Sequence, residues 1–194
     1  MLNILKFLKR RDNKQKLIET LKLGVIGILI LSVMRFSPFK LFYNHTSSMP
    51  IGWYFVNFAA RDVKINDLVI ACTPNKEMAE LALKRDYILH SKYACNWGSE
   101  YLLKRVVAAP GDTVLVKNNQ IYVNDKLLAN SVILVADHLN QPLKSILQSA
   151  TLDKNQYLLF GDTSSSFDSR YFGVVQRNNI KGKALPIYLK GINQ

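Results

Sequence analysis

The sequence is poor in cysteine, proline, glycine and acidic residues. Among its 194 residues, Cys occurs 2 times, Pro 6 times and Gly 9 times. These counts exclude a disulfide-rich scaffold, a four-cysteine zinc site and collagen-like or low-complexity structure. Asp and Glu number 14 against 26 Lys and Arg, so the net charge is +12. Such a charge balance favours binding to nucleic acid, to an anionic membrane surface or to an acidic partner, and it does not distinguish among these three.

Basic residues are concentrated near the N-terminus, directly before an apolar run. The first 22 residues contain seven basic side chains: Lys6, Lys9, Arg10, Arg11, Lys14, Lys16 and Lys22. The uncharged residues 23–34 that follow are by themselves short for a membrane span, which needs about 20 residues. Lys22 and Arg35 can extend their charges to the headgroups, so a tilted span over residues 18–36 is expected.

The positive-inside rule then assigns the three segments to compartments. The sequence predicts a basic cytoplasmic N-terminus at residues 1–17, a transmembrane anchor at residues 18–36 and an extracytoplasmic domain at residues 37–194. Two alternatives remain for the apolar run. A removable signal peptide would share the basic end, but residues 34–40 offer no small-x-small cleavage site. A buried core helix would leave the basic flank without a role.

The rest of the chain is predicted to be mainly β. Asn118 and Asn119 tolerate the positive φ of a tight turn, so they predict a hairpin between residues 114–117 and 120–123. Aromatic and β-branched runs predict further strands at residues 52–56, 68–72, 126–128, 157–160 and 184–189. Apolar residues at helical spacing predict a short helix at residues 75–89.

Three motifs follow the apolar run in a fixed order. They are Thr46-Ser47-Ser48-Met49-Pro50-Ile51-Gly52, then Leu103-Lys104-Arg105 leading to Pro110-Gly111-Asp112, then Gly161-Asp162 leading to Ser166-Phe167-Asp168-Ser169-Arg170-Tyr171-Phe172-Gly173. Each motif alone is typical of an ordinary turn or a surface ion pair. Their order and spacing after a basic, apolar segment are the informative feature.

In this combination the motifs resemble the type I signal peptidase family (peptidase S26) of membrane-bound Ser–Lys proteases. The heptapeptide from Ser48 to Tyr54 and the later pattern of Cys72, Tyr87, Cys95 and Lys104 are similar to those of its conjugative-transfer, TraF-type members. Asp86 departs from that pattern, because those proteins often have Gly before the tyrosine. The resemblance implies a LexA-like β fold of antiparallel sheets with a short helix, preceded by one N-terminal transmembrane helix.

The resemblance also implies roles for individual residues. Ser48 would attack the scissile carbonyl, and Lys104 would take its proton. Thr46 and the Ser48 amide would donate to the oxyanion, and Ser166 would orient the Lys104 amine. The ion pair of Asp168 and Arg170 would hold the third motif in place. The residues expected to support the catalytic pair are thus Thr46, Ser166, Asp168 and Arg170. No cofactor or metal is expected.

Elementary chemistry agrees with this assignment. A serine hydroxyl needs a base, and a lysine can serve only if burial lowers its pKa from about 10.4. Lys104 is surrounded in sequence by Leu102, Leu103, Val106 and Val107. In a strand, Lys104 and Arg105 point to opposite faces, so one can enter the core. His45, close to Ser48, remains the alternative base.

Two cysteines, Cys72 and Cys95, lie beyond the predicted anchor, where disulfides persist. A bond between them would close a loop of 24 residues. On the chain-entropy account, this closure stabilises the fold by roughly 3 kcal/mol. Two buried free thiols are the alternative.

These observations predict a serine endopeptidase anchored in the bacterial inner membrane, with its catalytic domain in the periplasm. It would cleave leader peptides from exported precursor proteins and mature a conjugative pilin subunit. Its partners would be those precursors and membrane lipid, with no nucleic acid. Whether it only cleaves, or also joins pilin ends by transpeptidation, stays open.

Four other functions remain as alternatives. A housekeeping signal peptidase I would differ in substrate range, and a LexA-like repressor would need a DNA-binding helix-turn-helix, which we do not find before Ser48. In a nucleic-acid-binding protein, aromatic residues should alternate with basic ones, and after residue 40 they do not. A non-catalytic membrane assembly protein of a secretion apparatus would have no use for Ser48 and Lys104 together.

Overall fold

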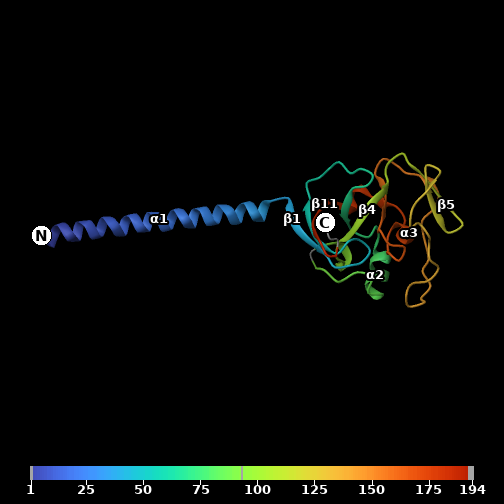
Figure 1. The fold of residues 1–194 in the computed structure, drawn as a ribbon, viewed down its shortest axis with the longest axis horizontal. Helices are drawn as coiled ribbons and strands as arrows, with labels where there is room; N and C mark the ends of the chain where they lie inside the picture. Colours follow the sequence, from blue (N-terminus) through green and yellow to red (C-terminus); the bar gives the residue numbers. More distant parts are fainter. Residues whose placement is uncertain (1, 93, 192–194) are drawn as a thin grey trace. The chain divides into compact units, whose positions relative to one another are not determined.

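The structure is a computed structural model that describes residues 2–92 and 94–191, without the side chains of residues 2–14, 17 and 34. The chain divides into two compact units, Met1–Pro38 and Phe39–Gln194. The first unit is a helix and the second is a mainly β domain (Figure 1).

The first unit consists of helix α1 (Leu2–Phe36). Its apolar side chains between residues 23 and 33 are exposed. Within the described part of the chain, no helix is long and apolar enough to cross a membrane. The predicted anchor at residues 18–36 includes Met34, whose side chain lies outside the described residues, as do the basic side chains of residues 6–14.

The second unit is built on a seven-stranded sheet in which all paired neighbours are antiparallel. Its strand order is β1-β2-β11-β3-β4-β9-β10. The strands are β1 (Phe39–Asn44), β2 (Gly52–Asn57), β3 (Leu68–Ala71), β4 (Leu102–Ala108), β9 (Gln156–Phe160), β10 (Val175–Gln176) and β11 (Ile180–Leu189). The predicted mainly β, antiparallel fold is therefore confirmed.

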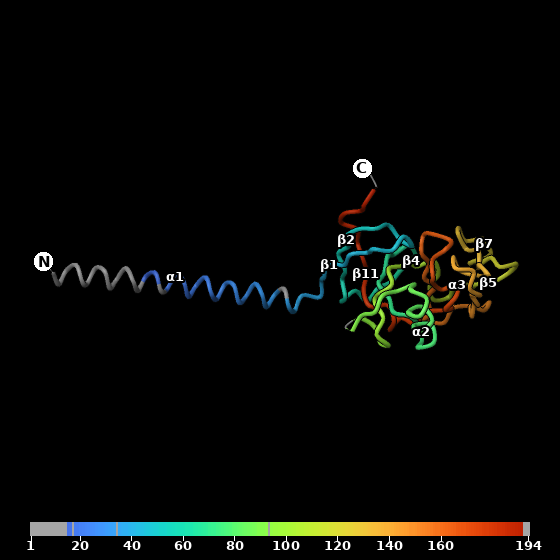
Figure 2. Tube along the Cα trace, turned by 90° about the horizontal axis from the view of Figure 1, so that it is seen from below, coloured from blue at the N-terminus to red at the C-terminus, as the bar shows by residue number. Residues whose placement is uncertain are grey.

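A second, four-stranded antiparallel sheet has the order β7-β6-β5-β8. Its strands are β5 (Thr113–Lys117), β6 (Gln120–Val123), β7 (Lys126–Leu127) and β8 (Ala150–Thr151). Asn118 and Asn119 have φ of 51° and 57°, so the β5–β6 hairpin turns at the predicted residues. Figures 1 and 2 both show β5 at the end of this domain that lies away from β1.

Helix α2 (Lys76–Lys84) begins where Asn75 Oδ1 accepts a hydrogen bond from the Met78 amide at 2.9 Å. It ends earlier than the predicted residue 89, because Asp86 adopts a φ of 54°, which a right-handed helix does not allow. The remaining helical elements are short: η1 (Asn96–Gly98), α3 (Ser169–Phe172) and η2 (Arg177–Asn179).

The large sheet determines where the functional motifs lie. The Ser48 segment is the loop between β1 and β2, whereas Lys104 lies on β4, with β11 and β3 between β2 and β4. A small hydrophobic cluster fills the space beneath this loop; it consists of Met49, Tyr54, Val56, Ile70, Leu103 and Ala184. Packing within this cluster brings together two motifs that are 56 residues apart.

Candidate active site

The loop that carries Ser48 is held by contacts on both sides of the serine. Met49 is 1% exposed and packs into the small cluster. The Tyr54 hydroxyl donates to the Pro50 carbonyl at 2.6 Å, and the Asp162 amide donates to the Ser48 carbonyl at 2.7 Å. The loop is therefore anchored by the sheet below it and by the third motif beside it.

Lys104 reaches Ser48 from β4. Its side chain is 3% exposed, and Nζ donates to Ser48 Oγ at 2.9 Å. Burial disfavours the ammonium form and, together with the positive charge of Arg170, lowers the pKa of Lys104 to about 8, although Asp168 and Asp162 act in the opposite direction. An amine with this pKa is neutral in a useful fraction of molecules near neutral pH, so it can accept a proton.

Arg105, the next residue, points to the other face of the strand, as the alternation of a strand requires. Its guanidinium makes a bidentate contact with Asp162, with both N–O distances at 3.0 Å. Because the Asp162 amide also binds the Ser48 carbonyl, this ion pair links the second motif to the nucleophile loop through the third.

Thr46 lies beside the nucleophile. Its Oγ1 is 3.2 Å from Ser48 Oγ, and among the described residues the Ser48 amide donates to no protein atom. The hydroxyl of Thr46 and the amide of Ser48 therefore lie on the nucleophile loop where an oxyanion site would need its donors.

Ser166 lines the same cavity, but its hydroxyl is not placed as expected. Between the described side chains of Ser166 and Lys104 there is no hydrogen bond, and Ser166 Oγ is buried without a partner. The Lys104 amine donates to Ser48 instead. Gly161 packs directly against Ser166, because a Cβ at position 161 would overlap Ser166 Oγ.

Asp168 and Arg170 form a fully buried ion pair, with Nη2 and Oδ2 2.6 Å apart. The carboxylate also accepts from the Gly161 amide at 2.8 Å. Arg170 donates further to the backbone carbonyls of Asn130, Thr163 and Ser164. A buried pair needs such additional hydrogen bonds to offset its desolvation, and here they hold the loop of residues 161–166 against Lys104.

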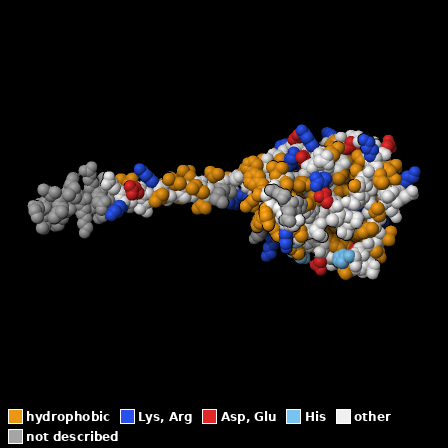
Figure 3. Space-filling model, viewed as in Figure 1, with side chains coloured by type: hydrophobic (Ala, Val, Ile, Leu, Met, Phe, Trp, Pro, Cys, Tyr) orange, Lys and Arg blue, Asp and Glu red, His pale blue; other side chains and the backbone are white. Residues whose placement is uncertain are grey.

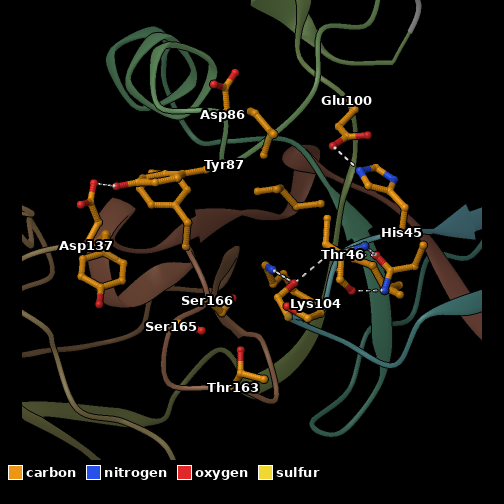
Figure 4. Close-up of a pocket in the computed structure, with 18 of the residues that line it drawn as sticks. His45, Thr46, Asp86, Tyr87, Glu100, Lys104, Asp137, Thr163, Ser165 and Ser166 are labelled. Carbon is orange, nitrogen blue, oxygen red and sulfur yellow. Dashed lines mark hydrogen bonds and ion pairs between the residues drawn. The ribbon is translucent and has the colours of Figure 1, made fainter. Parts of the chain in front are cut away.

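A cavity of ≈ 360 Å³ opens beside the two catalytic candidates (Figure 4). His45 Nε2 lies 3.6 Å from Glu100 Oε1 among the residues that line it. Away from His45, the Tyr87 hydroxyl donates to Asp137. His45 is therefore paired with a carboxylate, while Ser48 Oγ contacts Lys104 and Thr46.

A disulfide closes a loop of the chain that contributes to one wall of this cavity. Cys72 and Cys95 are bonded, with their Cα atoms 5.6 Å apart. The closed loop contains α2 and Tyr87. No group of three or more His, Cys, Asp or Glu side chains in the described ranges gathers as a metal site would require.

Three polar residues of this site were missed by the sequence analysis: Asn44, Asp162 and Asp137. Asp162 lay within the third motif, but its contacts with Arg105 and the Ser48 carbonyl are visible only in the structure. Asn44 and Asp137 lie outside all three motifs, and their contacts depend on how distant segments fold together.

The sequence itself identifies the protein's relatives. The sequence model described as signal peptidase, peptidase S26, matches residues 15–189. The chain belongs to this family. It is 36% identical over 146 residues to the plasmid transfer protein TraF of Escherichia coli, covering 74% of this chain and 80% of that protein.

Relatives that are named signal peptidase I, rather than transfer proteins, are also similar to the chain. Signal peptidase I V of Bacillus subtilis is 34% identical over 90 residues, which cover 42% of this chain and 54% of that protein. A crystal structure of a signal peptidase I from Enterococcus faecalis aligns with a TM-score of 0.35 and 19% identity, over 64% of this chain and 98% of that chain.

Proposed function

We propose that this member of the signal peptidase family is a serine endopeptidase with Ser48 as nucleophile and Lys104 as general base. One observation carries the proposal: a buried amine lies 2.9 Å from a serine hydroxyl at a cavity large enough for substrate side chains. Burial keeps the amine from being permanently charged, which is what a lysine base requires.

The chemistry follows from this contact. Ser48 Oγ forms a bond to the scissile carbonyl carbon while its proton moves to the neutral Lys104 Nζ. The C–N bond then breaks as that proton passes to the leaving amine, and an ester remains on Ser48. Water attacks this ester with the same base, the acid is released, and Ser48 regains its proton.

The tetrahedral intermediate carries its negative charge on the former carbonyl oxygen. The Ser48 amide and the Thr46 hydroxyl are the donors for this oxygen. Removal of one such donor typically lowers kcat by a factor of about 10² to 10³. The Asp168–Arg170 pair does not touch the reacting atoms, and its part is to hold the loop that faces Lys104.

The proposed substrates are leader peptides of exported proteins, and among them a conjugative pilin precursor. The similarity to plasmid transfer proteins named TraF supports the pilin assignment. The similarity to a signal peptidase I supports removal of leader peptides in general.

We propose further that the protein works at the bacterial inner membrane, with residues 18–36 as its anchor. An exposed apolar face on β1, β2 and β11 supports membrane association; it consists of Phe39, Leu41, Tyr43, Trp53, Phe55, Leu185, Ile187 and Tyr188. Figure 3 shows apolar side chains gathered where Figure 1 labels β1 and β11. Aromatic residues of this kind favour the membrane–water interface.

Ser48→Ala and Lys104→Ala test the proposed chemistry. Each variant should lose cleavage by a factor of at least about 10³, because the nucleophile or its base is missing. The assay uses full-length protein in detergent micelles and an internally quenched peptide with Ala-x-Ala before the scissile bond. Intact-mass spectrometry of the wild type during turnover should detect the acyl-enzyme on Ser48.

The control for this experiment is His45→Ala, which removes the alternative base. It should keep most of the cleavage activity, because His45 contacts Glu100 rather than Ser48. Substantial activity in either dyad variant, or loss of activity only in the His45 variant, would contradict the proposed mechanism. A non-catalytic assembly protein would show no cleavage and no acyl-enzyme with any variant.

A further inference from the structure

Asn44, the last residue of β1, holds the loop that carries Ser48. Its side chain is buried, and Nδ2 donates to the backbone carbonyls of Thr46 at 2.9 Å, Met49 at 3.0 Å and Pro50 at 3.1 Å. A flipped amide would bring Oδ1 against these three carbonyl oxygens. The hydrogen-bond network therefore assigns a single orientation to the Asn44 amide.

This orientation determines the direction of the Thr46 hydroxyl. Asn44 Oδ1 lies 3.0 Å from Thr46 Oγ1 and also accepts from the Thr46 amide at 3.4 Å. An amide oxygen can only accept, so the Thr46 hydroxyl donates at this contact. A hydroxyl has a single proton, so Thr46 Oγ1 must accept at its other contact, with Ser48 Oγ at 3.2 Å.

The hydrogen bonds consequently run in one direction. The Lys104 ammonium donates to Ser48, Ser48 donates to Thr46, and Thr46 donates to Asn44. An ammonium can only donate and is the stronger donor, so this direction favours the protonated form of Lys104. A neutral Lys104 amine can also donate here, but it cannot act as a base until Ser48 turns its proton from Thr46 to Nζ. When a neutral Lys104 receives the Ser48 proton, the oxygens of Ser48 and Thr46 face each other without a proton between them, unless Thr46 leaves Asn44.

We infer that Asn44 is a positioning residue that accepts the Thr46 proton in a hydrogen bond and thereby stabilises the protonated resting form of the Ser48–Lys104 pair. Until the oxyanion forms, the Thr46 hydroxyl stays bound to Asn44. The inference rests on the proposed function. A developing oxyanion attracts the Thr46 proton more strongly than a neutral amide oxygen does. Attack by Ser48 therefore releases Thr46 from Asn44 at the step where the new donor is needed.

Other charged groups also face Lys104. Asp168 and Asp162 raise its pKa, and Arg170 lowers it. The other titratable groups that line the same cavity are His45, Asp86, Tyr87, Glu100, Tyr101, Asp137, His138 and Tyr171. All these groups are retained in the variants below, so their effect on Lys104 is the same in every variant.

The experiment measures kcat/KM against pH for full-length protein in detergent micelles, with the quenched Ala-x-Ala peptide. For the wild type, the midpoint of the acid limb is expected at about 8. In Asn44→Ala, activity falls and the midpoint moves to lower pH by roughly 0.5 to 1 unit, the equivalent of one hydrogen bond that favoured the protonated form. Asn178→Ala, at an exposed asparagine, should leave the midpoint unchanged.

Thr46 supplies a second test that keeps the loop contacts of Asn44 to backbone carbonyls. Thr46→Val should move the midpoint in the same direction as Asn44→Ala, whereas Thr46→Ser should leave it in place. In the Thr46→Val background, Asn44→Ala should produce no further shift, because the chain is already interrupted.

An unchanged or raised midpoint in Asn44→Ala would overturn the inference, as would a shift that persists in the double variant. If Asn44→Ala does not fold, Thr46→Val decides the question by the same criterion. The inference and the proposed function fail separately. Residual activity in Ser48→Ala contradicts the proposed function. If the dyad variants are inactive but the midpoint of Asn44→Ala is unchanged, only the role of Asn44 is contradicted.

Discussion

At the scale of single residues, Lys104 is the group whose burial has the largest consequences. Its folded-state pKa of about 8 lies below the ordinary value of 10.5. Below pH 8 both the folded and the unfolded chain carry the proton, so the full cost of burying an ammonium opposes folding. Between pH 8 and 10.5 the unfolded chain binds more protons than the folded one, so stability rises with pH.

Lys104→Met should therefore stabilise the protein at pH 7 while abolishing cleavage. The gain has an upper bound of about 3 kcal/mol, since each unit of pKa shift corresponds to about 1.4 kcal/mol, and the lost contact with Ser48 reduces it. Thermal unfolding of full-length protein in detergent, followed at pH 7 and pH 10, measures the difference. The difference should shrink at pH 10, and exposed Lys117→Met should show no such pH dependence. A less stable Lys104→Met at pH 7 would contradict this account.

At the scale of structural elements, the disulfide connects the end of β3 to the chain that enters β4. The loop between Cys72 and Cys95 contains α2 and Tyr87, which forms part of the cavity wall. The Ser48–Lys104 contact does not depend on this loop, because it is made by the β1–β2 loop and by β4. Loss of the disulfide should therefore affect the cavity more than the catalytic pair.

The double variant Cys72→Ser, Cys95→Ser should lower the free energy of unfolding by roughly 3 kcal/mol, as expected for closure of a loop of this length. We expect KM for the quenched peptide to rise, with the pH midpoint of kcat/KM unchanged. Thermal unfolding and steady-state kinetics measure both effects, with reduced wild type as the control. Two alkylated thiols in freshly isolated protein would show that the bond is not formed in the cell.

At the scale of the whole molecule, the prediction concerns topology: N-terminus in the cytoplasm and catalytic domain outside it. Each juxtamembrane Lys or Arg near an anionic surface contributes about 1 kcal/mol, so the basic residues before position 23 should retain the N-terminus. A reporter that is active only outside the cytoplasm should be active when fused at Gln194 and silent when fused at Lys16. If protease added to spheroplasts leaves the domain intact, the topology is wrong.

Local patterns were enough to predict several features of this chain. The Asn118–Asn119 turn and the start of α2 depend on neighbouring residues alone. Strand β1 was not predicted, because Phe39, Leu41 and Tyr43 carry exposed apolar side chains and follow closely on an apolar run. The first three residues of β1 are all exposed and only Asn44 is buried, so the strand has no alternation of exposed and buried positions that the sequence could reveal.

The sequence by itself determined the family, the order of the three motifs and the residue types that can act as nucleophile and base, because these depend on chemical identity and spacing. Only the tertiary structure decided which groups meet. Asp162 binds both Arg105 and the Ser48 carbonyl, and Ser166 Oγ makes no hydrogen bond to the Lys104 amine that it was expected to orient. The physical reason is that hydrogen bonds are directional over about 3 Å, whereas motif spacing along the chain carries no information about direction.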